Sequence, residues 1–94
     1  MYNEHFIWNE NKHVANIKKH GITFPEAATV FDDPNAVNTY DLEHSYNEDR
    51  FIVIGLSENR RLLMVCHCFR DGDLIRIISA RKATKGEYKL YGGV

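Results

Sequence analysis

The segment from Leu62 to Arg81, LLMVCHCFRDGDLIRIISAR, decides the fold of this chain. Two apolar runs flank Asp71-Gly72-Asp73, a glycine-containing turn typical of a β-hairpin. Arg76 lies between two isoleucines, where its charge needs a partner or open solvent. The pattern therefore predicts a hairpin that forms the floor of an anion-binding site. Four cationic side chains lie on it: His67, Arg70, Arg76 and Arg81.

The composition is that of one globular domain, which we expect to span residues 1–94. Hydrophobic residues make up 44% of the chain and charged residues 27%, too apolar for a disordered chain. No stretch approaches the roughly 20 apolar residues of a membrane span. The first twelve residues have neither a basic start nor an apolar run, so we expect no signal peptide and a cytoplasmic protein with no membrane partner.

Charge is distributed unevenly along the chain. From residue 60 onward eight Lys/Arg face three Asp/Glu, a net charge of +5, whereas residues 1–59 carry a net charge of −6. This asymmetry suggests a basic face for a polyanion. The alternative is that the two halves neutralise each other in the fold.

The order of elements predicts an α+β fold: two N-terminal helices, a four-stranded antiparallel sheet and a short C-terminal helix. Asn9 caps a first helix over residues 10–20, which ends at Gly21. Thr23 and Glu26 form a capping box for a second helix. The remaining elements are listed by residue number: strands at 36–42, 50–56, 62–70 and 74–80, and a helix at 84–91.

Cys66-His67-Cys68 does not predict a metal site, because strand alternation puts both sulfurs on one face and the imidazole on the other. A zinc site also needs a second ligand pair, and none follows. Two cysteines separated by one strand residue are near the upper limit of disulfide geometry, so we expect free thiols. Phosphate-binding glycine motifs are missing as well, and we expect neither metal nor cofactor.

His67 allows two interpretations. An imidazole with a pKa near 6.5 suits acid–base catalysis, but a histidine in an apolar strand is equally often buried and bonded to a backbone carbonyl. Whether it shares a face with Arg76 depends on the hairpin loop. A loop of two or four residues puts them on one face, and a loop of three separates them.

Arg81 ends one strand and Arg50 begins another, next to Glu48. Either arginine could pair with a nearby carboxylate. Arginines that converge on one pocket would instead bind a phosphate bidentately.

Several ordered motifs resemble the BrnT family of bacterial type II toxins, which are small RelE-like ribonucleases. The resemblance rests on FIWNENK at 6–12, NIKKHGITFPEAATVFDDP at 16–34, DLEHSYNEDR at 41–50, H-x-x-R at 67–70, RIISARKAT at 76–84 and E-x-x-x-Y at 87–91. It implies a RelE-like fold, cleavage of messenger RNA, and neutralisation by a BrnA-type antitoxin through which alone the complex touches DNA. Phe69 departs from the pattern, since a polar residue is expected there.

The polar positions that match the family suggest a metal-independent ribonuclease in which the RNA 2′-hydroxyl attacks the adjacent phosphorus. The alternative is a non-catalytic interaction module whose basic face binds a partner. The expected catalytic residues are His67, Arg81, Arg50, Arg76 and Glu48, and the expected RNA-binding residues are Arg70, His44, Tyr88, Tyr91 and Lys82.

Overall fold

A computed structural model describes residues 5–92 of the chain. No helix in this range is long and apolar enough to cross a membrane. The elements are, in order, β1 (Phe6–Ile7), α1 (Glu10–His20), α2 (Phe24–Thr29), η2 (Val30–Asp32), β2 (Val37–Tyr40), η3 (Leu42–His44), β3 (Phe51–Leu56), β4 (Leu62–Phe69), β5 (Ile75–Lys82) and α3 (Lys85–Gly92). The predicted α+β fold is confirmed.

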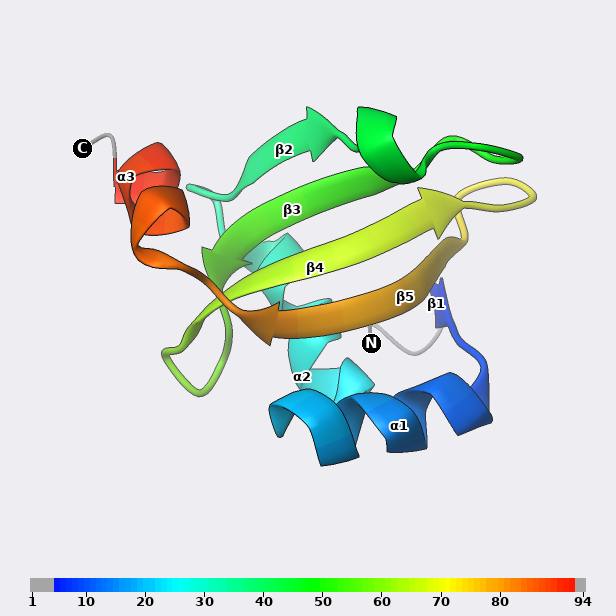
Figure 1. Cartoon of the computed structure of the whole chain (residues 1–94), viewed down its shortest axis with the longest axis horizontal. Coiled ribbons are helices and arrows are strands. Elements are labelled where there is room, and N and C mark those ends of the chain that lie inside the picture. Colours follow the sequence, from blue (N-terminus) through cyan, green and yellow to red (C-terminus); the bar gives the residue numbers. More distant parts are fainter. Residues whose placement is uncertain (1–4, 93–94) are drawn as a thin grey trace.

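The sheet has five strands, in the order β1-β5-β4-β3-β2 (Figure 1). The four predicted strands form its antiparallel part. The prediction of four strands was wrong, because Phe6 and Ile7 add a fifth that pairs parallel to β5. Ile75 N–H also donates to the His5 carbonyl at 2.8 Å, which extends the pairing of β5 with the N-terminal segment.

Helix α1 begins and ends where the sequence predicts. The Asn9 side chain accepts a hydrogen bond from Lys12 N–H, and Gly21 adopts φ 71° at the C-terminus. Gly21 N–H still donates to the Ile17 carbonyl, and the left-handed conformation, which glycine adopts without strain, then turns the chain out of the helix.

The capping box predicted for α2 is only half formed. Thr23 Oγ1 accepts from Glu26 N–H at 3.2 Å, as expected. The Glu26 side chain does not return the bond; it accepts hydrogen bonds from Ser57 and Arg61 near the β3–β4 turn. Glu26 is only 4% exposed, and a buried carboxylate is costly unless charged or polar donors bind it. The bonds from Ser57 and Arg61 therefore stabilise the protein more than the reciprocal cap would.

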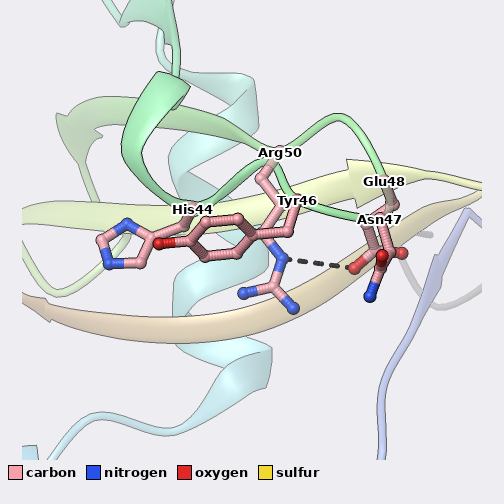
Figure 2. Close-up of a pocket in the computed structure, with 5 residues that line it drawn as sticks. All are labelled: His44, Tyr46, Asn47, Glu48 and Arg50. Carbon is pink, nitrogen blue, oxygen red and sulfur yellow. Dashed lines mark hydrogen bonds and ion pairs between the residues drawn. The ribbon is translucent and has the colours of Figure 1, made fainter.

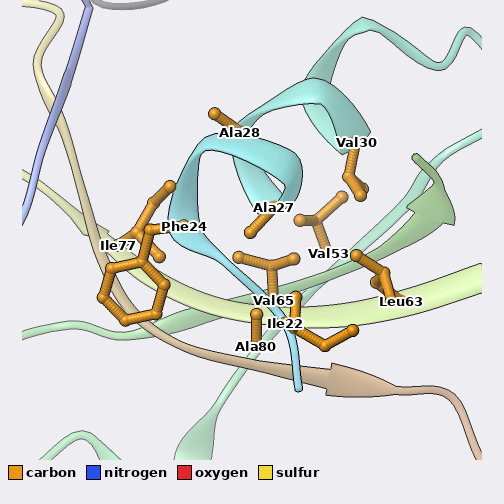
Figure 3. Close-up of a cluster of buried hydrophobic side chains, with 10 residues drawn as sticks. All are labelled: Ile22, Phe24, Ala27, Ala28, Val30, Val53, Leu63, Val65, Ile77 and Ala80. Atoms are coloured by element: carbon orange, nitrogen blue, oxygen red, sulfur yellow. The ribbon is translucent and has the colours of Figure 1, made fainter. Parts of the chain in front are cut away.

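The main core lies between the sheet and the segment that holds α2 and η2 (Figure 3). Its ten buried residues are Ile22, Phe24, Ala27, Ala28, Val30, Val53, Leu63, Val65, Ile77 and Ala80. The opposite face of the sheet, called the open face below, is covered at one end by α3, where Tyr91 packs against Ile54, Leu62 and Met64. The rest of this face is the floor of the candidate site.

A five-residue loop, 70–74, closes the β4–β5 hairpin. Phe69 pairs with Ile75, Cys68 with Arg76 and His67 with Ile77, so His67 and Arg76 lie on opposite faces. Farther along, Cys66 pairs with Ser79, which leaves Ile78 without a partner in a β-bulge.

Candidate active site

Two adjoining cavities form a cleft between the segment 41–50 and the open face of the sheet. One is lined by His44, Tyr46, Asn47, Glu48 and Arg50 (Figure 2). The other, of about 310 Å³, is lined by Asp41, Glu43, His44, Arg50, Ile52, Met64, Cys66, Ile78, Ser79 and Arg81. His44 and Arg50 line both cavities, so we treat the two as one cleft.

Three arginines surround the Glu48 carboxylate at one end of the cleft. Arg76 Nη2 donates to its Oε2 at 2.6 Å, and Arg50 Nε donates to the same oxygen at 3.2 Å. Arg70 Nη1 lies 3.9 Å from Oε1. Figure 2 shows Arg50 reaching from the start of β3 toward Glu48. These arginines come from three separate segments, and the fold brings them together around one negative charge.

Partial burial raises the pKa of Glu48, but the hydrogen bond from Arg50 and the positive charge of Arg76 outweigh it and hold the pKa below its usual value. Glu48 is therefore ionised at neutral pH. Cys68 at the floor adds a weak link, because its Sγ lies 3.7 Å from Glu48 Oε1 and 3.4 Å from Arg76 Nε.

Arg81 lies at the other end of the cleft and is paired with Glu87 of α3. Its two terminal nitrogens donate to the two Glu87 oxygens, each at 2.9 Å. Glu87 in turn is held by a reciprocal cap, since Thr84 N–H donates to its side chain and Glu87 N–H donates to Thr84 Oγ1. The Arg81 guanidinium is thus oriented by a carboxylate that is itself fixed at the start of α3.

His44 is the imidazole that faces the cleft. Its side chain is 57% exposed, and its Nδ1 lies 3.0 Å from Oδ2 of the buried Asp41. With Nδ1–H donating to Asp41, Nε2 is the atom available for proton transfer. A carboxylate behind an exposed imidazole is an arrangement suited to acid–base chemistry.

His67 does not join this group. It is 1% exposed on the core face, packs edge-on against Phe31, and has Nδ1 3.2 Å from the Val65 carbonyl. Burial lowers the pKa of His67, which favours the neutral form at pH 7. The placement matches the second of the two interpretations, a core histidine bonded to the backbone, and argues against direct contact with a substrate.

The other predicted RNA-binding residues are dispersed. Arg70 is exposed at the hairpin loop beside Glu48. Lys82 and Tyr88 line a different hollow, next to the Arg81 end of the cleft. Tyr91 is turned away, with its hydroxyl donating to Asp33 at 2.7 Å, so it secures α3 to the body of the protein.

Cys66 and Cys68 are free, buried thiols on the open face, opposite His67 as strand alternation predicts. Burial and the nearby Asp41 raise the pKa of Cys66 to about 11. A protonated thiol is a poor nucleophile, so Cys66 contributes shape to the floor rather than reactivity.

Sequence reasoning missed Asp41 and Glu87 as partners of site residues. The Thr84-x-x-Glu87 pattern is a capping-box signal that could have placed Glu87 at a helix start. Asp41 lies three residues before His44, but the 3₁₀ turn that brings the two together has no comparable signal.

The fold and the cleft define a class of protein. An α+β sheet whose open face is lined by arginines, with carboxylate and imidazole groups at hand, suits a polyanion such as RNA. A solved structure of another protein shares this fold. A structural match covers 85% of this chain and 96% of the other chain, the Brucella abortus ribonuclease toxin BrnT, with a TM-score of 0.66 and 23% identity. At this identity the match establishes the fold alone.

The family follows from the sequence match. The model of the ribonuclease toxin BrnT of type II toxin–antitoxin systems matches residues 8–87, and the chain belongs to this family. A search of curated proteins gives no match. The protein is therefore a ribonuclease toxin, which implies an RNA substrate and a cognate antitoxin.

Proposed function

We propose that this toxin cleaves messenger RNA in the cleft without a metal ion. The observation that carries the proposal is the arrangement of Arg50 and Arg81 around one cavity of about 310 Å³, with His44 at its rim. In the reaction the 2′-oxygen forms a bond to phosphorus while the bond from phosphorus to the 5′-oxygen breaks. The products carry a 2′,3′-cyclic phosphate and a 5′-hydroxyl.

The arginines stabilise the charge that builds up on the phosphorane. Glu48 takes the proton from the 2′-hydroxyl, and His44 gives a proton to the departing 5′-oxygen. In the free protein Glu48 sits where a phosphate would, between Arg50 and Arg76. A bound phosphate competes for these guanidinium groups, so the pKa of Glu48 rises and the carboxylate becomes a stronger base when substrate is present.

The partner is a BrnA-type antitoxin that covers the cleft. A partner that covers the cleft excludes RNA from it, and charge complementarity to the arginines speeds such association. Contact with promoter DNA is made by the antitoxin, and the substrate, messenger RNA, places the action in the cytoplasm.

The test is cleavage of a defined single-stranded RNA in EDTA by the wild type and by Arg81→Ala. We expect cyclic-phosphate ends from the wild type and a rate roughly 10²- to 10³-fold lower for the variant, as when one charge-stabilising donor is removed. No cleavage by folded wild-type protein, or cleavage only with added metal, would contradict the proposal.

A matched variant separates chemistry from structure. Glu87→Gln removes the charge of the ion-pair partner but keeps an amide oxygen that can accept from Arg81, and we expect it to retain most of the activity. Equal losses in Arg81→Ala and Glu87→Gln would mean that the pair only holds α3. An Arg81→Ala protein that still binds antitoxin but no longer cleaves RNA favours the enzyme over a pure interaction module.

A further inference from the structure

A second basic hollow lies where β4 begins and β5 ends, beside α3. Its volume is about 300 Å³, and it is called the distal hollow below. Its lining residues are Arg60, Arg61, Leu62, Lys82, Ala83 and Tyr88. None of the residues that line the cleft also lines the distal hollow.

Two of its three cations are uncompensated. Arg61 is neutralised by the buried Glu26. Arg60 and Lys82 are exposed and make no ion pair with any residue between 5 and 92. Arg60 also has φ 61°, a left-handed conformation that residues other than glycine seldom adopt, at the tip of the β3–β4 turn. Two free charges at one hollow favour an anionic ligand.

An aromatic ring completes the hollow. Tyr88 is 55% exposed and follows Glu87, the partner of Arg81, on α3. Lys82 follows Arg81 directly on β5, so the distal hollow and the cleft are neighbours along the strand, although alternation turns these two side chains to opposite faces of the sheet. Cations beside an exposed aromatic ring are the means by which proteins bind single-stranded nucleic acid, through phosphate contacts and base stacking.

We propose that the distal hollow is a second subsite for the single-stranded RNA substrate. Arg60 and Lys82 contact its backbone phosphates, and Tyr88 stacks on a base. The inference rests on the proposed placement of cleavage in the cleft. Arg76, at the Glu48 end of the cleft, and Lys82 are six residues apart on β5, about 20 Å at the rise of a strand, so only an RNA of several nucleotides runs from that end of the cleft into the distal hollow.

The experiment measures binding of uncleavable 2′-O-methyl RNA, three or nine nucleotides long, by fluorescence anisotropy over a range of salt concentrations. For Arg60→Ala/Lys82→Ala we expect the slope of log affinity against log salt to fall by about 1.4 with the long RNA, at about 0.7 per phosphate contact. Lys12→Ala/Lys19→Ala, which removes two exposed charges from α1, should leave it unchanged. Tyr88→Ala should weaken binding of the long RNA roughly 5- to 100-fold.

Three outcomes would overturn the distal subsite: an unchanged slope with the long RNA, an equal loss with the short one, or no measurable binding of either RNA by the wild type. Loss of antitoxin binding with RNA binding intact would identify a protein interface instead. Because the probe cannot be cleaved, the result is independent of the proposed chemistry. A wild type that binds RNA in this length-dependent way but fails to cleave it would contradict the proposed function and leave the subsite standing.

Discussion

Glu48 determines the electrostatics of the cleft, because its carboxylate is the shared partner of three arginines. Without it, like charges would face each other across the floor of the sheet. The carboxylate therefore keeps the arginine side chains in place, and under the proposed function an incoming phosphate has to displace it.

Glu48→Gln should separate these two effects. Without the negative charge we expect uncleavable RNA to bind more tightly, while the cleavage rate falls roughly 10²- to 10⁴-fold because the proposed general base is lost. Anisotropy and single-turnover cleavage measure the two quantities. Glu58→Gln is the matched control, since Glu58 is exposed, lies outside the cleft and makes no ion pair within residues 5–92. Weaker RNA binding by Glu48→Gln would contradict the proposed competition with phosphate.

Single residues show what the sequence could predict of the site. Arg50 and Arg81 were predicted either to pair with a carboxylate or to bind a phosphate from one pocket, and the structure shows both paired with carboxylates while lining one cavity. Whether His67 and Arg76 share a face of the sheet depends on the length of the hairpin loop and on the strand register, and sequence periodicity does not determine either.

At the scale of elements, Gly55 sets how closely η2 approaches β3. A Cβ at this position would lie 2.8 Å from Val30 Cγ1 and 3.1 Å from Ala36 Cβ. Val30 belongs to the main core and is fully buried, so it has little room to move. The absence of a side chain at Gly55 therefore allows the 3₁₀ turn η2 to pack directly on β3.

Gly55→Ala should destabilise the protein by about 1–3 kcal/mol through overpacking. Gly86→Ala is its counterpart, because the nearest atom to the new Cβ is 3.9 Å away on exposed α3. There alanine should stabilise by up to about 1 kcal/mol through helix propensity. Urea unfolding measures both, and equal stability of the two variants would refute the packing argument.

The predictability of elements follows the strength of local signals. Asn9, Gly21 and Thr23 are chemical markers of helix ends, and the structure uses each as expected. The two-residue β1 has no such marker, and its partner strand lies almost seventy residues later. Parallel pairing over that distance is a tertiary event that local patterns do not reveal.

At the scale of the whole molecule, both interpretations of the uneven charge hold in part. Ion pairs join the acidic and basic halves where Glu26 meets Arg61 and Glu48 meets Arg76. Arg60 and Lys82 remain unpaired within the described residues. The sequence predicted the imbalance, but which charges cancel depends on contacts between segments far apart in the chain.

These pairs also predict how stability depends on pH. Hydrogen bonds from Arg61 and Arg81 lower the pKa of Glu26 and Glu87 below the ordinary value of 4.5. A carboxylate whose pKa is lower in the folded than in the unfolded state stabilises the fold at pH values above its ordinary pKa. This stabilisation is lost as the pH falls through the lowered pKa of the folded state. The protein should therefore lose stability below about pH 4.5, which urea unfolding across pH can measure.

Glu26→Gln tests one of these contributions. It should cost about 2 kcal/mol at pH 7, where a hydrogen-bonded charge is lost, and much less at pH 3. Unfolding curves whose difference from the wild type is the same at both pH values would contradict this assignment.

The bulge at Ile78 has a consequence for how related chains can vary. Arg76 and Arg81 are five positions apart, an odd interval that would put them on opposite faces of a regular strand. Their partners, Cys68 and Met64, are four apart, so the extra residue returns both arginines to the same face. In homologous chains the number of residues between the two arginines and the presence of the bulge must therefore change together. Loss of one residue from this strand preserves both the cleft and the core only if the bulge is the part that disappears.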